Sequence, residues 1–403
     1  MKRHICLFVM GLAACACSSD KQSSLESIDV IGAFDQMTPI SVSDLGKTVS
    51  YVPLETSDES LIGKNAYIRM LKDRLIVGSY EQPLKMFDKA SGQFIGTIGS
   101  IGQGPGEYTL QEGIPVCWVD DATQTIYVQS SSNKLLRFDI NGQPLSSLDL
   151  PEGFPPVQFS SVITNNNNVL AYQSTCFSKP EHKIVGYNIE NSQLQNRIAN
   201  DNDSIAFNMV DAYLPRKDYR SIPVSTGTAA IVLKDKRLVY IVNKEPAVWS
   251  YGNGFYFKEN FNDTIYQVTG DELEPKLVFA MGDKTITPET VFNPEATKNK
   301  LAVNYVLEGD DALFFSLEGN YFHLTDYKRY WGVYNKKDKS VKITDACEIV
   351  DPEKNVHIEQ LHSATSSGAM VGLIDTYTCM EDGRNSNTFN VKDDDNPIAV
   401  IIE

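Results

Sequence analysis

The chain has 403 residues, with 52 acidic side chains against 36 basic ones and a formal net charge of −16. This excess of carboxylates argues against nucleic acid as a partner, because binding to phosphates requires a basic surface. The length exceeds that of the usual single hydrophobic core, so we expect either two domains or one domain built from repeats.

The first residues have the pattern of a bacterial export signal. Lys2 and Arg3 precede an apolar run from Ile5 to Ala14, and small residues lead into Cys15. The run is too short to cross a membrane as a helix, which needs about 20 residues. The pattern resembles the lipobox of bacterial lipoproteins, which implies that residues 1–14 are removed and that Cys15 receives a diacylglycerol and a further acyl chain.

Cys17 is an alternative acceptor, because it also follows a small residue and precedes the polar run Ser18–Lys21. We prefer Cys15, and an ordinary cleaved secretory peptide is the other alternative. Residues 15–40 are then the lipidated N-terminus and its tether. The predicted location is the cell envelope, as an outer-membrane lipoprotein that contacts the membrane through its lipid, with the periplasmic and the surface face both open.

After the tether, the dominant signal is that of short β-strands. Val, Ile, Tyr and Phe alternate with polar residues, and Gly, Asn, Asp and Pro separate the runs. Examples are residues 74–79 (RLIVGS), 125–129 (TIYVQ), 237–242 (RLVYIV), 254–258 (GFYFK) and 313–317 (LFFSL). Only Pro288–Val303 has the composition of a helix, and we expect it in a connection.

A repeat appears when two of these segments are superposed. Leu75–Val77 and Lys85–Asp88 match Ile126–Val128 and Leu136–Asp139, both at an offset of 51 residues. Further copies lie at Trp331–Lys336 and, more weakly, at Asp263–Val268. A period slightly above 50 residues with about four strands indicates a β-propeller, and the chain length gives six or seven blades. A pair of β-sandwiches is the alternative.

Several motifs make the resemblance specific: Val52–Thr56 (VPLET), Leu61–Gly63 (LIG), Ile98-Gly99 with Gly102–Tyr108 (GQGPGEY), Asn262–Tyr266 (NDTIY) and Asp395–Ile398 (DNPI). The chain resembles the six-bladed β-propeller lipoproteins, a bacterial group related to NHL-repeat and TolB-like propellers. The resemblance implies an all-β, six-bladed propeller of four-stranded antiparallel blades over residues 41–403, with seven blades as the alternative. It implies no catalytic residues.

The C-terminal residues Pro397–Glu403 (PIAVIIE) are apolar enough to form a buried strand. A circular array must join its last blade to its first without leaving an open sheet edge. We therefore expect this segment to pair, in one blade, with strands near Val49–Leu54.

Candidate ligand contacts come from the GQGPGEY loop and from the aromatic stretch Asn320–Trp331. The loop is expected to connect the first two blades tightly, and it can reach the channel mouth. Exposed aromatic side chains there suit sugar rings or apolar peptide side chains. The candidates are Glu107, Tyr108, Tyr321, His323, Tyr327, Tyr330 and Trp331.

No motif indicates catalytic residues, a metal or a cofactor. His357 and His362 are five residues apart, which on one strand puts them on opposite faces and argues against a shared metal. The cysteines downstream of the tether are far apart, and we expect unpaired buried thiols rather than disulfides. They are Cys117, Cys176, Cys347 and Cys379.

The expected function is that of a non-catalytic binding or scaffolding module for a glycan, a peptide or an envelope protein. The alternative is a hydrolase or lyase that acts on a polymer at the channel mouth. A histidine, His323, His357 or His362, placed beside two carboxylates in a concave channel mouth would favour the enzyme.

Overall fold

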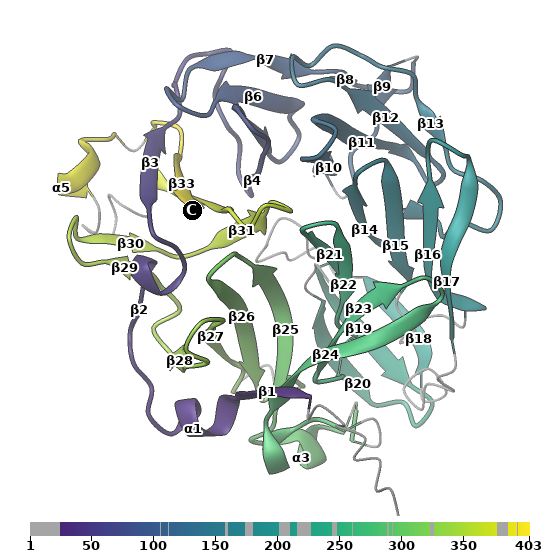
Figure 1. The fold of residues 1–403 in the computed structure, drawn as a ribbon, viewed down its shortest axis with the longest axis vertical. Helices are drawn as coiled ribbons and strands as arrows, with labels where there is room; N and C mark the ends of the chain where they lie inside the picture. Colours follow the sequence, from purple (N-terminus) through teal and green to yellow (C-terminus); the bar gives the residue numbers. More distant parts are fainter. Residues whose placement is uncertain are drawn as a thin grey trace, which may run out of the picture.

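The computed structural model describes residues 25–403 except 105, 112, 158–159, 174–179, 201–209, 216–226, 244–247, 260, 288–289, 292, 323–325, 377–385 and 393. Nearly all regular structure in these residues is β-strand, arranged as sheets around a central axis (Figure 1). The predicted all-β propeller is therefore confirmed. The signal peptide and both candidate acceptor cysteines lie outside the described residues. No helix in the described part of the chain is long and apolar enough to span a membrane.

Seven sheets built on antiparallel strands follow one another along the chain. The first two consist of β4 (Tyr67–Met70), β5 (Arg74–Gly78), β6 (Leu84–Asp88) and β7 (Phe94–Ile98), then β10 (Cys117–Asp120), β11 (Thr125–Ser131), β12 (Lys134–Phe138) and β13 (Leu148–Asp149). The next two consist of β14 (Ser160–Asn165), β15 (Asn168–Gln173), β16 (His182–Asn188) and β17 (Gln193–Ala199), then β18 (Val210–Pro215), β19 (Gly227–Leu233) and β20 (Leu238–Asn243).

The remaining three sheets complete the molecule. They consist of β21 (Val248–Tyr251), β22 (Gly254–Phe257), β23 (Thr264–Thr269) and β24 (Glu272–Ala280); of β25 (Leu301–Glu308), β26 (Ala312–Gly319), β27 (Lys328–Asn335) and β28 (Val341–Thr344); and of β31 (Leu361–Ala364), β32 (Met370–Ile374), β33 (Ile398–Ile402) and β3 (Val49–Pro53). Two smaller sheets are β8 (Ser100–Ile101) with β9 (Glu107–Tyr108), and β2 (Ile40–Ser41) with β29 (Ile349–Asp351) and β30 (Val356–Ile358).

The blade count in chain order is thus seven, the alternative, so the predicted six is one too few. The additional blade, β18-β19-β20, has three strands rather than four within the residues that the structure describes. The blades before and after it also pack directly on each other, since β14 contacts β21 and one apolar cluster joins Leu170 to Phe257. The inner strands around the axis are therefore those of the other six sheets, β4, β10, β14, β21, β25 and β31, and β31 packs against β4.

Burial explains the strand pattern. All residues of β25 and β26 are buried, because sheets on both sides cover them; most of their side chains are apolar, with the buried polar residues Asn304, Glu308, Ser316 and Glu318 among them. The outer strand β7 instead alternates between partly buried and exposed residues. The apolar clusters lie between neighbouring sheets, so each blade buries its faces against other blades.

The sequence repeat corresponds to equivalent strands. Leu75–Val77 and Ile126–Val128 lie on β5 and β11, the second strands of their blades. The other copies lie on the third strands, namely β6, β12, β23 and β27. The repeat in the sequence therefore marks equivalent strands of different blades.

The propeller begins earlier than Ser41, the predicted boundary. β1 (Glu26–Asp29) adds to the edge of β24 as a parallel fifth strand, and α1 (Val30–Phe34) follows it. Ile28, Val30 and Ile40 are fully buried. Residues 26–40, which we had assigned to the tether, are therefore part of the folded body.

The predicted helix over Pro288–Val303 is reduced to α3 (Pro294–Thr297). Asn293 caps this helix, but Lys298 is extended and Asn299 has a φ of 61°, which ends it. Leu301–Val303 enter β25, where their burial overrides helical composition. Other short helical elements in the described part of the chain are α5 (Ser386–Phe389) and the 3₁₀ turns η1 (Val42–Asp44) and η3 (Gly282–Lys284).

The predicted ring closure is confirmed. β3 pairs antiparallel with β33 along its whole length, from Val49 opposite Ile402 to Pro53 opposite Ile398. Buried Asn396 reinforces the junction: its Oδ1 accepts from the Ile62 amide at 2.7 Å, and its Nδ2 donates to the carbonyls of Glu55 and Ser60 at 2.6 and 2.9 Å. The VPLET, LIG and DNPI motifs therefore meet at the closure.

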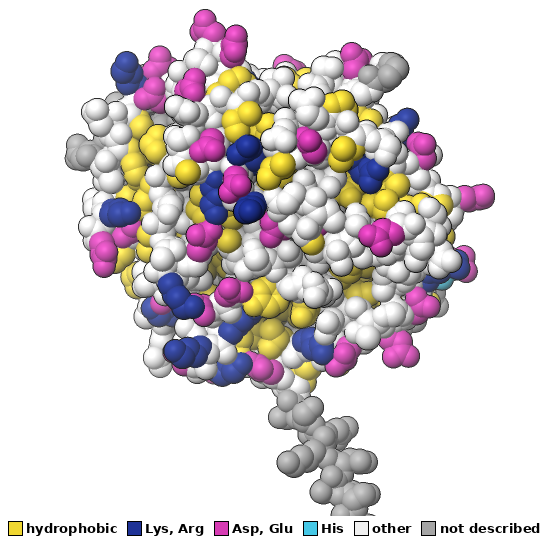
Figure 2. Space-filling model, turned by 45° about the horizontal axis from the view of Figure 1, so that its top comes forward, with side chains coloured by type: hydrophobic (Ala, Val, Ile, Leu, Met, Phe, Trp, Pro, Cys, Tyr) yellow, Lys and Arg dark blue, Asp and Glu magenta, His cyan; other side chains and the backbone are white. Residues whose placement is uncertain are grey.

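The face of the molecule shown in Figure 2 mixes acidic and basic side chains. Neither sign forms a continuous patch over that face. The excess of acidic residues is thus spread among basic ones there.

Deleting residues 397–403 should abolish cooperative unfolding of the whole domain, because β3 and β32 lose the strand that lies between them. Thermal denaturation followed by circular dichroism or calorimetry measures this. A melting profile equal to that of the intact chain would contradict the role of β33.

Candidate functional site

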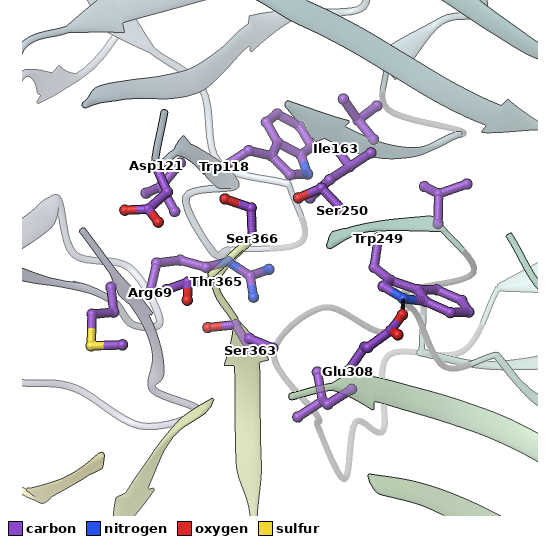
Figure 3. A pocket seen from close by; sticks show the side chains of 16 residues that line it. Arg69, Trp118, Asp121, Ile163, Trp249, Ser250, Glu308, Ser363, Thr365 and Ser366 are labelled. Atoms are coloured by element: carbon purple, nitrogen blue, oxygen red, sulfur yellow. Dashed lines mark hydrogen bonds between the residues drawn. The ribbon is translucent and has the colours of Figure 1, made fainter. Parts of the chain in front are cut away.

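The inner strands converge on a small cavity at the propeller axis, with a volume of about 60 Å³ (Figure 3). Every inner strand supplies at least one lining residue, and the loop after β31 adds Thr365 and Ser366. From β4 to β31 in chain order, these residues include Arg69, Trp118, Ile163, Trp249, Glu308 and Ser363. The cavity has room for a few water molecules or for one end of a larger ligand.

Arg69 and Trp118 occupy equivalent positions in their blades. Arg69 lies opposite Ile76 in the β4–β5 register, and Trp118 lies opposite Tyr127 in the β10–β11 register. Ile76 and Tyr127 correspond in the 51-residue repeat. The same place in two neighbouring blades therefore carries a cation in one and an indole in the other.

Trp249 is fixed by a carboxylate. Its Nε1 donates to Glu308 Oε2 at 2.6 Å, and the other oxygen of Glu308 accepts from Lys336 Nζ at 2.7 Å. Lys336 also lies 3.9 Å from the centre of the Tyr251 ring. Glu308 is thus neutralised by its own lysine and holds the indole in one orientation.

Arg69 has fewer partners. Its Nη1 donates to the carbonyl of His362 at 3.1 Å, and its guanidinium lies 5.5 Å from the centre of the Tyr67 ring. No carboxylate in the described part of the chain forms an ion pair with it. In Figure 3 the guanidinium points into the middle of the cavity, beside the hydroxyl-bearing residues of the β31 end.

His362, whose carbonyl accepts from Arg69, is close enough for the arginine's charge to act on its side chain. Burial, and the positive charge of Arg69 in second place, lower the pKa of His362 to about 3. Its Nδ1 has no hydrogen-bond partner among the described residues. His362 is therefore neutral at pH 7 and cannot form an ion pair with an acidic ligand there.

Several lining hydroxyls and one carboxylate complete the cavity. Ser363 Oγ donates to the Ile68 carbonyl, whereas the Ser250 and Ser366 hydroxyls make no hydrogen bond to described residues. Asp121 accepts from Ser367 Oγ and from Gln124 Nε2, both at 3.2 Å. The polar part of the lining can thus donate to a ligand from Arg69 and from two serines.

The GQGPGEY loop connects the first two blades, as predicted, but its candidate residues face elsewhere. Tyr108 is fully buried; its hydroxyl donates to the Ile98 carbonyl and accepts from the Leu84 amide. Glu107 folds back on its own loop, where its carboxylate accepts from the Gly104 amide at 2.7 Å. Neither residue lines the axial cavity. Glu107 and Tyr108 are therefore not ligand contacts at this cavity, and both stabilise the loop that connects the first two blades.

The aromatic stretch Asn320–Trp331 is also mostly core. Tyr321, Tyr330 and Trp331 are buried, which corrects their assignment as ligand contacts. Tyr327 is partly buried and its hydroxyl donates to buried Glu318, a bond that a ligand would have to break. His323 lies outside the described residues.

Sequence reasoning missed Trp118 and Trp249, although the chain has only three tryptophans. The repeat was aligned on second and third strands, while the cavity is built from first strands. Extending the alignment backward through the β10–β11 hairpin would have placed Trp118 level with Arg69.

The described histidines do not form the arrangement required by the enzyme alternative. His357 Nδ1 lies 3.1 Å from Glu348, on the β29–β30 hairpin, outside the axial cavity. His362 faces a cation. Among described residues, no three His, Cys, Asp or Glu side chains group as metal ligands. Neither Cys117, which is buried, nor Cys347, which is partly buried, forms a disulfide, as predicted; Cys176 and Cys379 lie outside the described residues.

Comparison with known proteins shows the family and the fold. The profile of a family described as "Domain of unknown function (DUF4934)" matches residues 25–403. The crystal structure of a Bacteroides fragilis protein named "Putative exported protein (BF0058)" superposes with a TM-score of 0.60 at 16% identity, covering 91% of this chain and 97% of that one. The comparison with curated proteins found no match.

Two further solved structures superpose more weakly. U3-55K has a TM-score of 0.39 at 10% identity, covering 90% of this chain and 100% of its own. The RRP9 WD40 repeats have a TM-score of 0.38 at 9% identity, covering 91% and 99%. The relation to NHL-repeat and TolB-like propellers stays a prediction.

His362 should make stability depend on pH. Since its pKa is near 6.5 when unfolded and about 3 when folded, the unfolded chain binds more protons between these values, and stability falls as the pH drops from 6.5 toward 3. At pH 5 this group should lower the free energy of unfolding by about 2 kcal/mol. Urea unfolding should show that the free energy of unfolding falls less from pH 7 to pH 5 in His362→Gln than in the wild type. Parallel pH profiles would contradict the assignment.

Proposed function

The chain belongs to the DUF4934 family, whose domain is one of unknown function, and we propose that it is an exported lipoprotein that binds a ligand at the axial cavity without transforming it. The observation that carries this proposal is the composition of the cavity. Two tryptophans, a guanidinium with unused N–H groups and two serines whose hydroxyls have no partner among the described residues converge there from several blades. Concave apolar sites with a few convergent polar groups are where small ligands and ligand ends bind.

The rigidity of the ring supports binding at this place. Trp249 is held by Glu308, and the strands that carry the other lining residues are buried between blades. Preformed sites of this kind lose little free energy to ordering when a ligand arrives. The partner would be a glycan, a peptide or an envelope protein, of which one end enters the cavity.

The cell-envelope location rests on the N-terminal sequence and on the similarity to a protein named as exported. If Cys15 is acylated, residues 16–24 separate the lipid from the folded body. Nine residues reach at most about 30 Å. Because β1 adds to the outer edge of the β24 sheet, the tether would hold the propeller close to the membrane by its rim.

The enzyme alternative has no observation in its favour among the described residues. It requires a histidine near two carboxylates at the channel mouth. His357 contacts one carboxylate elsewhere, and the charge that acts on His362 is the positive charge of Arg69.

Lipidation can be tested at the two cysteines. In cells of the native host fed with labelled palmitate, we expect Cys15→Ala to abolish incorporation and Cys17→Ala to retain it. The reverse result would assign Cys17 as the acceptor. Labelling that neither substitution affects would overturn the lipoprotein part of the proposal.

Binding can be tested with Ser366→Trp, which puts an indole into the 60 Å³ cavity. The chain from Leu25 onward, which contains every strand that the structure describes, is screened on glycan and peptide arrays. For true ligands we expect at least tenfold weaker binding to Ser366→Trp, and unchanged binding to Ser100→Trp, a control at an exposed serine on β8. Chemical analysis of each bound ligand should recover it intact. Reproducible bond cleavage would favour the enzyme instead.

A further inference from the structure

We propose that Arg69 receives a free carboxylate, and that the ligand is a peptide whose C-terminus, with a small apolar last residue, enters the axial cavity. This inference rests on the proposed binding function and names the ligand class of the same site. Two features of the cavity carry it: the unused donors of Arg69 and the apolar surroundings in which they lie.

The first feature is a guanidinium without an anion. An arginine has five N–H donors in a flat fork that fits a carboxylate with two parallel hydrogen bonds. In the described part of the chain, only one of these donors is used, toward the His362 carbonyl. The guanidinium is directed into the cavity in Figure 3, and Arg69 is only partly buried.

Among the described residues, no carboxylate forms an ion pair with Arg69, and the titratable groups beside it are uncharged. Three titratable groups interact electrostatically with Arg69: Tyr67, Cys117 and Tyr305. Burial raises the pKa of each, so all three are uncharged at pH 7. His362 is uncharged as well. The positive charge is therefore open for an incoming anion.

The carboxylates that line the cavity have other partners. Glu308 is held by Trp249 and Lys336. Asp121 accepts from Ser367 and Gln124. Ser250 and Ser366, whose hydroxyls have no partner among described residues, can donate to the carboxylate that Arg69 holds.

The second feature, the lining, favours a peptide end over an acidic sugar. Besides the two tryptophans, half of the lining residues are aliphatic, among them Met70, Val162, Val248, Leu307 and Ala364, and most of the surface that the walls present to the cavity is apolar. A sugar would bring hydroxyls that need partners, and leaving them unpaired in such surroundings costs free energy. Trp118 and Trp249 are each only 5% exposed, so they offer no open face for a sugar ring. A C-terminal carboxylate beside a small apolar side chain matches both the size and the chemistry.

The test is a randomised heptapeptide library, made once with free C-terminal carboxylates and once with C-terminal amides, offered to the chain from Leu25 onward. We expect enrichment only from the free-acid library, with Ala or another small apolar residue at the last position. Glucuronate and glucose are measured in parallel by calorimetry. Binding of glucuronate without any peptide would overturn the peptide assignment.

Variants then localise the carboxylate. Arg69→Met should weaken binding of an enriched peptide by about 10- to 100-fold, the range for a lost charge-assisted contact. Arg69→Lys keeps the charge but loses the fork, so it should fall between Arg69→Met and the wild type. Asp121→Asn should tighten binding roughly two- to fivefold, because it removes a negative charge near the bound anion. Arg137→Met, outside the cavity, is the matched control and should change nothing.

The outcomes separate the two proposals. Peptides that bind from both libraries and lose affinity in Ser366→Trp, but not in Arg69→Met, would leave the axial site standing and overturn its carboxylate specificity. If Ser366→Trp affects no peptide, glycan or glucuronate, the axial binding function itself is wrong. The unfolding midpoint in urea should be unchanged or higher in Arg69→Met, since the arginine has no ion pair to lose; a large drop would assign Arg69 a structural role instead.

Discussion

The pairing of β3 with β33 is the interaction on which the rest of the structure depends. Each blade buries its faces against its neighbours, so an open ring would expose two of these faces at once. The cluster at the junction joins Val52 of β3 and Ile401 of β33 to Leu75 and Val77 of the first blade. The cavity at the axis exists only when this junction is made, because Arg69 and Ser363 come from the two blades that it brings together.

Buried polar groups reinforce the joints between blades. Asp120, fully buried, accepts from the amides of Ala122 and Thr123 in its own hairpin and from those of Asn166 and Asn167 in the next blade. Lys258 donates to the Val303 carbonyl across another joint, and burial lowers its pKa to about 8. Breaking one such partnership would leave a buried charge uncompensated, which makes these joints specific as well as tight.

The fold could be predicted because its signals are local and repeated. Leu75–Val77 and Ile126–Val128 show the period, and the apolar end at Ile398–Ile402 predicts the closing strand. The blade count could not be predicted, because β18–β20 lies outside the superposed segments. The N-terminal boundary could not be predicted either, because Glu26–Asp29 has the composition of a polar tether and only the structure shows that Ile28 is buried and that the segment pairs with β24.

The candidate site could not be predicted for a different reason: the sequence near a predicted loop does not distinguish exposed aromatic residues from buried ones. Tyr330 and Trp331 pack in the core, while Trp118 and Trp249 line the axis. What distinguishes the axial residues is their convergence from separate blades. No sequence spacing expresses that convergence until the first strands of all blades are superposed.

Asp120 and Arg69 show how to tell a structural charge from a functional one in this ring. Both lie on inner strands, yet Asp120 has four amide donors, whereas Arg69 uses one donor and has no counter-ion among the described residues. A fold under selection for stability alone gains nothing from an uncompensated cation at its centre. Departures from internal consistency concentrate at functional sites. The incomplete partnership of Arg69 therefore marks the axis as the place where this propeller meets its ligand.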